Sequence, residues 1–213
     1  IMGRAIKQGI ITINLYNIRD YSLDKHKSVD DYVYGGGNGM LMMCQPICDC
    51  FRSFHKENTK TIYMSPKGKL LTDKMARDLA KEKEINILCG HYEGVDERAL
   101  EIIDAEPISI GDYILTGGEI ASEVLVDAVS RHIDGVLSNN QSHDTESFYD
   151  DLLEYPQYTR PEVYEDKKVP EILLTGDHKK VEEWKLEKSI EITKNLRPDM
   201  YERYIKRDKG EQI

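Results

Sequence analysis

The chain has 213 residues, of which 39% are hydrophobic, and a formal net charge of −10 at pH 7. That length allows one good hydrophobic core, or one core with a small satellite domain. The acidic balance argues against a protein that coats nucleic acid non-specifically, because phosphate binding normally requires a basic face. No apolar run is long enough to cross a membrane and no signal peptide is visible, so we expect a soluble, cytoplasmic protein.

Predicted strands and helices alternate along the first two thirds of the chain. Short apolar or alternating runs predict strands at 10–15, 61–65, 85–89, 108–110 and 113–116. Helical periodicity predicts helices at 72–82, 96–103 and 119–131. The last of these helices carries one apolar face, made of Ile120, Val124, Leu125, Ala128 and Val129. This alternation predicts an α/β domain with a largely parallel sheet.

The remainder of the chain begins with a polar stretch at 138–151. Its few large apolar groups predict a flexible linker or lid. Asp177 is the predicted N-cap of a helix that runs to about Leu196, close to the proline that ends it. We therefore expect a first domain at 1–137, an interdomain linker at 138–151 and a small helical domain at 152–213.

The segment SIGDYILTGGE at 109–119 carries the most informative local pattern. Its turn at Gly111 and its paired glycines Gly117-Gly118 allow backbone N–H and C=O groups to approach a ligand without an intervening Cβ. The segments YMSP at 63–66 and CG at 89–90 also lie at the ends of predicted strands, where open α/β sheets bind ligands. An ordinary turn is the better interpretation of any one of these glycines, but several together favour a shared pocket.

Four long, ungapped motifs occur in an order seen in one family. They are DDYVYGGGNGM at 30–40, CGHYEGVDER at 89–98, SIGDYILTGGE at 109–119 and LLEYPQYTRPE at 152–162. On these motifs essentially the whole chain resembles the bacterial tRNA (guanine-N1)-methyltransferases of the TrmD type, which belong to the SPOUT class. The usual Rossmann and P-loop fingerprints are absent from the sequence, which disfavours a Rossmann-type methyltransferase or an NTPase.

The resemblance implies an architecture and an activity. The fold would be a SPOUT-type parallel sheet with a deep trefoil knot, joined to a small all-helical C-terminal domain that binds the anticodon stem-loop of tRNA. The enzyme would be a homodimer that uses S-adenosylmethionine to methylate N1 of guanosine 37 in tRNA. Its two-fold symmetry would give two equivalent sites, each completed across the subunit interface.

The resemblance also assigns the methyl-donor site. The positions that match the family's donor-binding loops are Gly90, Ile110, Gly111, Asp112, Tyr113, Ile114 and Leu115, with Tyr63, Ser65, Pro66, Glu93 and Gly117 lining the rest of the pocket. We expect the glycines of the segment 35–39 to let the backbone approach a guanine that has left the base stack. A flexible turn without a binding role is the alternative for that segment.

Methylation of N1 requires two further groups, because N1 of guanine carries a proton near neutral pH. A general base must remove this proton, and a cation or donor must stabilise the charge that develops on O6. The resemblance assigns the cation to Arg131, for which the alternative is a helix-terminal charge or a surface pair with Asp127.

The family's catalytic aspartate aligns with Glu146, whose additional methylene moves the carboxylate by about 1.5 Å. A misplacement of about 1 Å can slow a positioned reaction by about 100-fold, but a loop that orders on binding could absorb the difference. We predict Glu146 as the base and Asp144 as the second candidate. A solvated linker acid is the alternative for either residue.

Candidate metal ligands are few. The family is linked to Mg²⁺, which Glu93 or Asp96 could attract, but the sequence shows no complete ligand set and we predict no metal ligand. The four cysteines lack paired C-x-x-C spacing, so reduced thiols are expected. Cys44-x-x-x-Cys48-x-Cys50 is a weak metal candidate.

Other positions depart from the family pattern. Tyr32 and Val33 replace an Arg-Pro pair, and His91 replaces an arginine, which removes a fork of donors suited to phosphate. The resemblance also implies that roughly two dozen further residues, forming a strand and a short helix, precede Gly3.

Two alternative functions stay open. The first is another SPOUT-class RNA methyltransferase with a different target base, which would retain donor binding but show altered tRNA specificity. The second is a non-catalytic RNA-binding module that has lost turnover with the aspartate. The complete set of donor-loop motifs argues against the second alternative.

Overall fold

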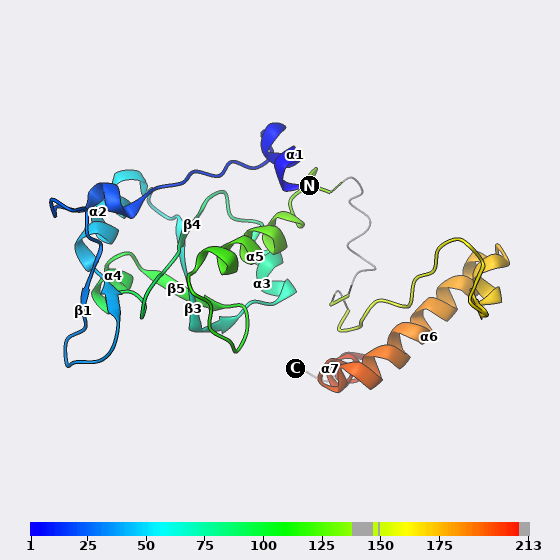
Figure 1. Cartoon of the computed structure of the whole chain (residues 1–213). Coiled ribbons are helices and arrows are strands. Elements are labelled where there is room, and N and C mark those ends of the chain that lie inside the picture. Colours follow the sequence, from blue (N-terminus) through cyan, green and yellow to red (C-terminus); the bar gives the residue numbers. More distant parts are fainter. Residues whose placement is uncertain (138–146, 149, 209–213) are drawn as a thin grey trace. The chain divides into compact units, whose positions relative to one another are not determined.

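In the computed structural model the described residues are 1–137, 147–148 and 150–208. The chain divides into two compact units, Ile1–Asn139 and Asn140–Ile213. The first unit contains α1 (Met2–Lys7), η1 (Ile18–Tyr21), β1 (Asp30–Tyr32), β2 (Met40–Met42), α2 (Cys44–Phe54), β3 (Lys60–Leu70), α3 (Asp73–Leu79), β4 (Ile85–Leu88), α4 (Glu97–Ile102), β5 (Ala105–Ser109) and α5 (Glu119–Ser130) (Figure 1). The second unit contains β6 (Val163–Tyr164), β7 (Lys167–Lys168), η3 (Glu171–Leu174), α6 (His178–Leu196) and α7 (Pro198–Asp208).

β3 is the central strand of a three-stranded sheet with the order β4-β3-β5. Both of its neighbours are parallel to it: residues 60–63 pair with 85–88 of β4, and residues 61–64 pair with 105–108 of β5. The register between β3 and β5 then shifts between Met64 and Lys69. Because parallel strands need crossover connections, helices separate these strands along the chain. This arrangement confirms the predicted mixed α/β class with a parallel sheet.

Helices cover both faces of the sheet. Successive side chains of a strand point to opposite faces, so Ile62 and Met64 pack on one side of β3 and Tyr63 packs on the other. The first core cluster joins β3 and β5 to α3 and α5 through Ile62, Met64, Ala76, Leu79, Ile108, Ala121, Leu125 and Val129. The second cluster involves α2 and α4 and consists of Met42, Ile47, Cys48, Leu88, Val95, Ala99 and Ile103.

The predicted helix starts are confirmed by their caps. The Thr72 hydroxyl accepts a hydrogen bond from the Met75 N–H at 3.2 Å, at the start of α3. The Asp96 carboxylate accepts one from the Arg98 N–H at 3.0 Å, at the start of α4. These side chains satisfy backbone donors that have no partner within the helix, which is why such residues mark helix starts in the sequence.

Two predicted strands are wrong. Residues 10–15 run outside any strand, and Leu15 is 91% exposed. Residues 113–116 form an irregular segment with bends at 113 and 116, and the nearby Gly117 makes an isolated bridge to His91. Alternating apolar residues form a strand when a neighbouring strand supplies hydrogen-bonding partners. In the described part of the chain, neither segment has such a neighbour.

The predicted apolar face of α5 is correct in part. Leu125 and Val129 are buried against the sheet, together with Ala121. Ile120 and Val124, which belong to the same predicted face, are 58% and 43% exposed. The apolar face of α5 is therefore wider than the part of it that packs against the hydrophobic core of the same chain.

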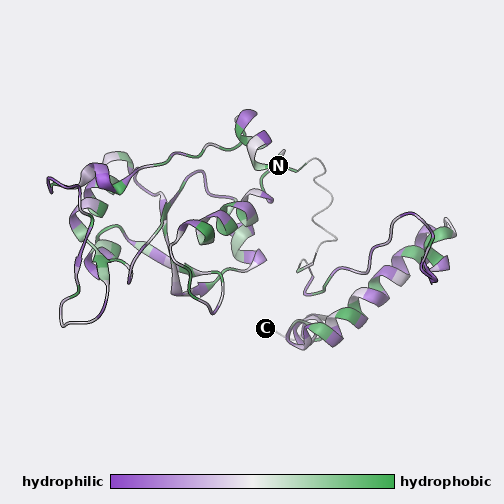
Figure 2. Ribbon diagram, viewed as in Figure 1, coloured by the Kyte–Doolittle hydropathy of each residue, from purple (hydrophilic) through white to green (hydrophobic). Residues whose placement is uncertain are grey.

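The second unit is built on the long helix α6. Asp177 caps it by accepting from the Lys180 N–H at 3.3 Å, and α7 follows at Pro198, as the sequence predicts for the end of α6. The buried hydroxyl of Thr193 accepts a hydrogen bond from the Leu153 N–H at 2.8 Å. This bond holds the segment that precedes β6 against α6. Hydrophobic and hydrophilic residues alternate along α6 (Figure 2). Among the described residues, no helix is long and apolar enough to span a membrane.

Candidate functional site

Two glycine-containing loops meet beyond the carboxyl end of the parallel sheet. The loop at 89–94 follows β4, and the loop at 110–118 joins β5 to α5. The Gly118 N–H donates to the Gly90 carbonyl at 2.8 Å, and a Cβ at Gly118 would lie 2.9 Å from the Cys89 Cα. Such a close approach of two backbones requires glycine at position 118. The structure thus brings the predicted site residues Gly90 and Gly117 to adjacent segments.

Tyr63 forms a wall beside the first of these loops. A Cβ at Gly90 would lie 2.9 Å from the Tyr63 Cε2, so the ring lies against the backbone of Gly90. Burial raises the pKa of Tyr63, the charge of Glu97 raises it further, and a hydrogen bond with Ser65 opposes them. The phenol is therefore neutral near pH 7 and provides an apolar surface with a hydroxyl at its edge. Ser65 is itself buried, whereas Pro66 is exposed.

The loop between β5 and α5 holds most of the other predicted donor-binding residues. Ser109 shapes its start, because the Ser109 hydroxyl accepts from the Gly111 N–H at 3.1 Å. The Tyr113 hydroxyl donates to the Ile110 carbonyl at 3.3 Å, so the ring folds back over the turn. Asp112, Tyr113, Ile114 and Leu115 are all exposed, with Ile114 at 79%. The apolar side chains of Tyr113, Ile114 and Leu115 are therefore not covered by the hydrophobic core of the first unit.

Glu93 connects this region to the glycine-rich segment at 35–39. Its N–H donates to the Met40 carbonyl at 3.0 Å, and its side chain lies so close to Gly39 that a Cβ there would be 2.6 Å from the Glu93 Cγ. Gly39 has φ of +95°, a backbone conformation that favours glycine. The segment predicted to approach the target base therefore lies beside the loop predicted to bind the methyl donor.

Arg131 lies at the opposite end of α5 from these loops. It is the C-cap residue of the helix, and its N–H donates to the Asp127 carbonyl at 3.2 Å. The 12 residues of α5 separate it from Gly118 by about 18 Å along the helix axis. Within one chain, the structure therefore does not bring Arg131 together with Gly90 and Gly117. The predicted base Glu146 and its alternative Asp144 lie outside the described residues.

Two histidine contacts, one at each end of α5, were not anticipated from the sequence. The His132 Nε2 lies 3.1 Å from the Asp73 Oδ1, which ties the end of α5 to the first turn of α3. Asp73 also forms an ion pair with Arg77 at 2.9 Å. The His91 Nε2 contacts the Glu119 Oε1, which ties the loop after β4 to the first residue of α5. The i,i+4 spacing of Asp73 and Arg77 is visible in the sequence, whereas the histidine contacts join residues far apart in the chain.

The described residues contain no group of three or more His, Cys, Asp or Glu side chains able to hold a metal ion. Asp96, a candidate for attracting Mg²⁺, forms an ion pair with Arg98 at 2.6 Å, and this hydrogen-bonded pair lowers the pKa of Asp96. The Cys44 and Cys48 sulfurs lie 3.6 Å apart as free thiols. Burial raises the pKa of Cys48 and of Cys50 to about 11, so both thiols are protonated near neutral pH.

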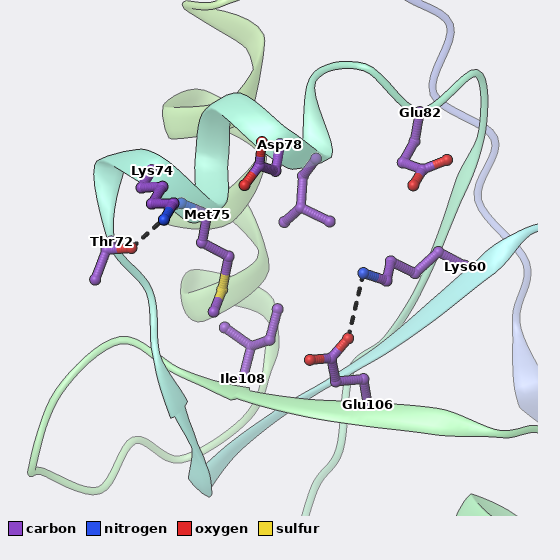
Figure 3. A pocket seen from close by; sticks show the side chains of 9 residues that line it. Lys60, Thr72, Lys74, Met75, Asp78, Glu82, Glu106 and Ile108 are labelled. Carbon is purple, nitrogen blue, oxygen red and sulfur yellow. Dashed lines mark hydrogen bonds and ion pairs between the residues drawn. The ribbon is translucent and has the colours of Figure 1, made fainter. Parts of the chain in front are cut away.

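A separate cavity of about 330 Å³ lies between α3 and the sheet (Figure 3). Its apolar lining comes from Met75, Leu79 and Ile108, and Lys60 and Glu106 form an ion pair at 3.3 Å within it. Its remaining lining residues are Thr72, Lys74, Asp78 and Glu82. None of the residues predicted for the donor site lines this cavity, so it is distinct from the region where the glycine-rich loops meet.

Glycine-containing loops that meet at the carboxyl end of a parallel sheet are the arrangement at which open α/β proteins bind their ligands. A family model described as tRNA (Guanine-1)-methyltransferase TrmD matches residues 1–203. The chain belongs to this family of enzymes.

Curated relatives are similar over almost their whole length. The tRNA (guanine-N(1)-)-methyltransferase of Lachnospira eligens is 55% identical over 99% of this chain and 91% of that protein. The protein with the same name from Clostridium botulinum strain Hall is 53% identical over 100% of this chain and 89% of its own length. That of Ruminiclostridium cellulolyticum is 54% identical over 94% and 88%, respectively.

Proposed function

We propose that this protein transfers the methyl group of S-adenosylmethionine to N1 of guanosine 37 in tRNA. The proposal rests on the match of the family model to residues 1–203. It is supported by the contacts between the two glycine-containing loops at Gly90 and Gly117. The name that these relatives share, tRNA (guanine-N(1)-)-methyltransferase, supports a tRNA substrate and the N1 position of guanine. The methyl donor and position 37 follow from the resemblance of the sequence motifs.

The residues present fit a nucleoside-containing donor. The exposed side chains of Tyr113, Ile114 and Leu115 offer apolar contacts to a purine ring, and the neutral Tyr63 phenol borders the same loops. When bound, S-adenosylmethionine supplies an electrophilic methyl group on a sulfonium. We assign its binding to Gly90, Ile110, Gly111, Asp112, Tyr113, Ile114 and Leu115, with Tyr63, Ser65, Pro66, Glu93 and Gly117 completing the pocket.

Two charged groups act on the guanine. Glu146 removes the N1 proton, which turns N1 into a nucleophile for the methyl carbon. Arg131 donates to O6, where negative charge accumulates as the proton leaves. The assignment of Glu146 rests on the sequence alone, since this residue lies outside the described part of the chain.

A second copy of the chain completes the site in this proposal. The length of α5 supports this arrangement, because it separates Arg131 from Gly118 by about 18 Å within one chain. The exposed Ile120 and Val124 on α5 support an interface there, since apolar side chains on a helix surface favour association. A symmetric homodimer would then hold two equivalent sites.

The finer architecture follows from the family and belongs to the same proposal. It comprises the SPOUT-type deep trefoil knot, a cytoplasmic location, and a small helical C-terminal domain that holds the anticodon stem-loop. In that domain Lys185 and Lys188 are paired with glutamates at 2.7 and 2.6 Å, whereas Lys167 and Lys168 of β7 are exposed. The exposed β7 lysines are therefore the better candidates for phosphate contacts. A role of Mg²⁺ stays part of the proposal through the family alone.

The test is methyl transfer from labelled S-adenosylmethionine to two tRNA transcripts that differ only in G or A at position 37. Transfer confined to the G transcript, and lost in Glu146→Ala, supports both the reaction and the base. Equal transfer to both transcripts overturns the positional assignment. Donor binding without transfer identifies a binding module, and activity retained in Glu146→Ala moves the base to Asp144 or elsewhere.

A further inference from the structure

His91 and Glu119 make a side-chain contact between two segments that are 28 positions apart in the chain. The His91 Nε2 contacts the Glu119 Oε1, and both side chains are about half-exposed. The backbone of His91 is held separately, since its N–H donates to the Met42 sulfur at 3.2 Å. The imidazole is thus presented to Glu119 from a loop that is anchored on β2.

The contact lies directly over one of the glycine turns of the proposed donor site. A Cβ at Gly117 would lie 2.7 Å from the His91 Cε1 and 2.5 Å from the Glu119 Oε2. Both side chains of the pair therefore pack on the same glycine. His91 directly follows Gly90 and Glu119 directly follows Gly118, so the pair flanks the two loops that the proposal assigns to the donor.

Few other contacts hold these two loops together. Among the described residues, the backbone contacts between them are the Gly118 N–H to the Gly90 carbonyl at 2.8 Å and the bridge between His91 and Gly117. Glycine has more conformational freedom to lose than any other residue, so an ordered glycine loop needs additional contacts. A side-chain pair that restricts both loops before the ligand arrives lowers the entropy lost on binding.

We propose that His91 and Glu119 form a positioning pair that holds the two donor loops in their binding arrangement and thereby sets the affinity for S-adenosylmethionine. The inference rests on the proposed function, because it requires the donor to bind at these loops. Neither residue is assigned a part in proton or methyl transfer. The pair therefore affects the dissociation constant and the KM of the donor, and leaves kcat at saturating donor nearly unchanged.

Glu119 has a second role that the test must separate from the first. It is the acidic residue in the first turn of α5, where a negative charge is stabilised by the helix dipole. Loss of the charge alone could therefore weaken the helix start without any contribution from His91. A double-mutant cycle isolates the interaction between the two side chains from such individual effects.

The experiment is titration of S-adenosylmethionine into the full chain and into His91→Gln, Glu119→Gln and the double variant. Each single change is expected to weaken donor binding roughly threefold, the size typical of a half-exposed pair, and the double variant is expected to bind no more weakly than either single variant. His91→Arg keeps a donor that can reach Glu119, and is expected to retain the parent affinity. Steady-state kinetics is expected to show the change in KM for the donor rather than in kcat.

The matched control is the ion pair between Lys56 and Glu84 at 2.5 Å, which joins the connections that precede β3 and β4. Lys56→Gln and Glu84→Gln are expected to leave donor affinity unchanged. Additive losses in the His91 and Glu119 cycle, or coupling that is present in thermal stability and absent from donor affinity, overturn the inference. A parent chain that binds no donor overturns the proposed function and this inference together, whereas unchanged affinity in both single variants overturns the inference alone.

Discussion

The glycines of the candidate site are required by contacts within the protein as well as by access to a ligand. A Cβ at Gly118 would meet the backbone of Cys89 and Gly90, and a Cβ at Gly90 would meet the Tyr63 ring. The sequence motif predicts that glycine matters at these positions. The reason lies in the approach of two loops, because the atoms that exclude a side chain belong to segments far away in the chain.

Gly118→Ala tests this requirement directly. The added Cβ would lie 2.9 Å from the Cys89 Cα and from the Gly90 N, so the backbone must move. Overpacking of this kind typically costs about 1 to 3 kcal/mol of stability, and we expect donor binding to weaken with it. Thermal unfolding and donor titration measure the two effects. Gly3→Ala is the control, because beyond the backbone of its own helix no atom lies within 4 Å of its added Cβ; a loss of equal size in that variant would contradict the explanation.

The buried cysteines of α2 predict a pH dependence. Burial raises the pKa of Cys48 and of Cys50 from an ordinary value near 9 to about 11. Folding therefore favours the protonated thiols, and the stability that they contribute is complete below pH 9 and lost as pH rises through about 11. Urea unfolding of the parent chain and of Cys50→Ala from pH 8 to pH 11 measures this contribution, and the stability difference between the two chains is expected to shift against the parent as pH rises. A difference that stays constant over this range would contradict the raised pKa.

At the scale of elements, α5 combines two surfaces. Leu125 and Val129 pack on the sheet, as its apolar periodicity predicts. Ile120 and Val124 belong to the same sequence pattern but remain exposed in the single chain. Periodicity shows that a helix carries a wide apolar face. It does not show which residues of that face pack in the core of the same chain and which are covered by another molecule.

Ile120→Glu combined with Val124→Glu tests whether a second copy covers the exposed part of α5. Two charges buried in an interface cost several kcal/mol, so the dissociation constant of the dimer is expected to rise roughly 100-fold or more. Sedimentation velocity measures the association state, and methyl transfer is expected to fall with it. Thermal stability of the monomer should change little, because both side chains are exposed within the chain. Leu23→Glu, at another exposed apolar position, is the control; dimers retained in the double variant would contradict an interface at this face.

At the scale of the whole molecule, the structure divides the chain into the units Ile1–Asn139 and Asn140–Ile213. The domain bounds and the linker at 138–151 that the sequence suggests stay a prediction. Asp151, at the end of that stretch, forms an ion pair with Arg203 of α7 at 2.9 Å and so belongs to the packed part of the second unit. A polar composition marks a stretch without a core, but it does not reveal which of its charges find partners.

The sequence by itself determined the alternation of strands and helices, the helix starts near Thr72 and Asp96, the cap at Asp177, and the family. These features depend on backbone preferences and on neighbours within a few positions, so they can be read locally. Only the tertiary structure decided that residues 113–116 form a bent loop, that His91 meets Glu119, and that α5 separates Arg131 from the glycine loops. Each of these three features depends on which segments, distant in sequence, become neighbours in space. Packing between elements determines those neighbours, and the local sequence pattern does not.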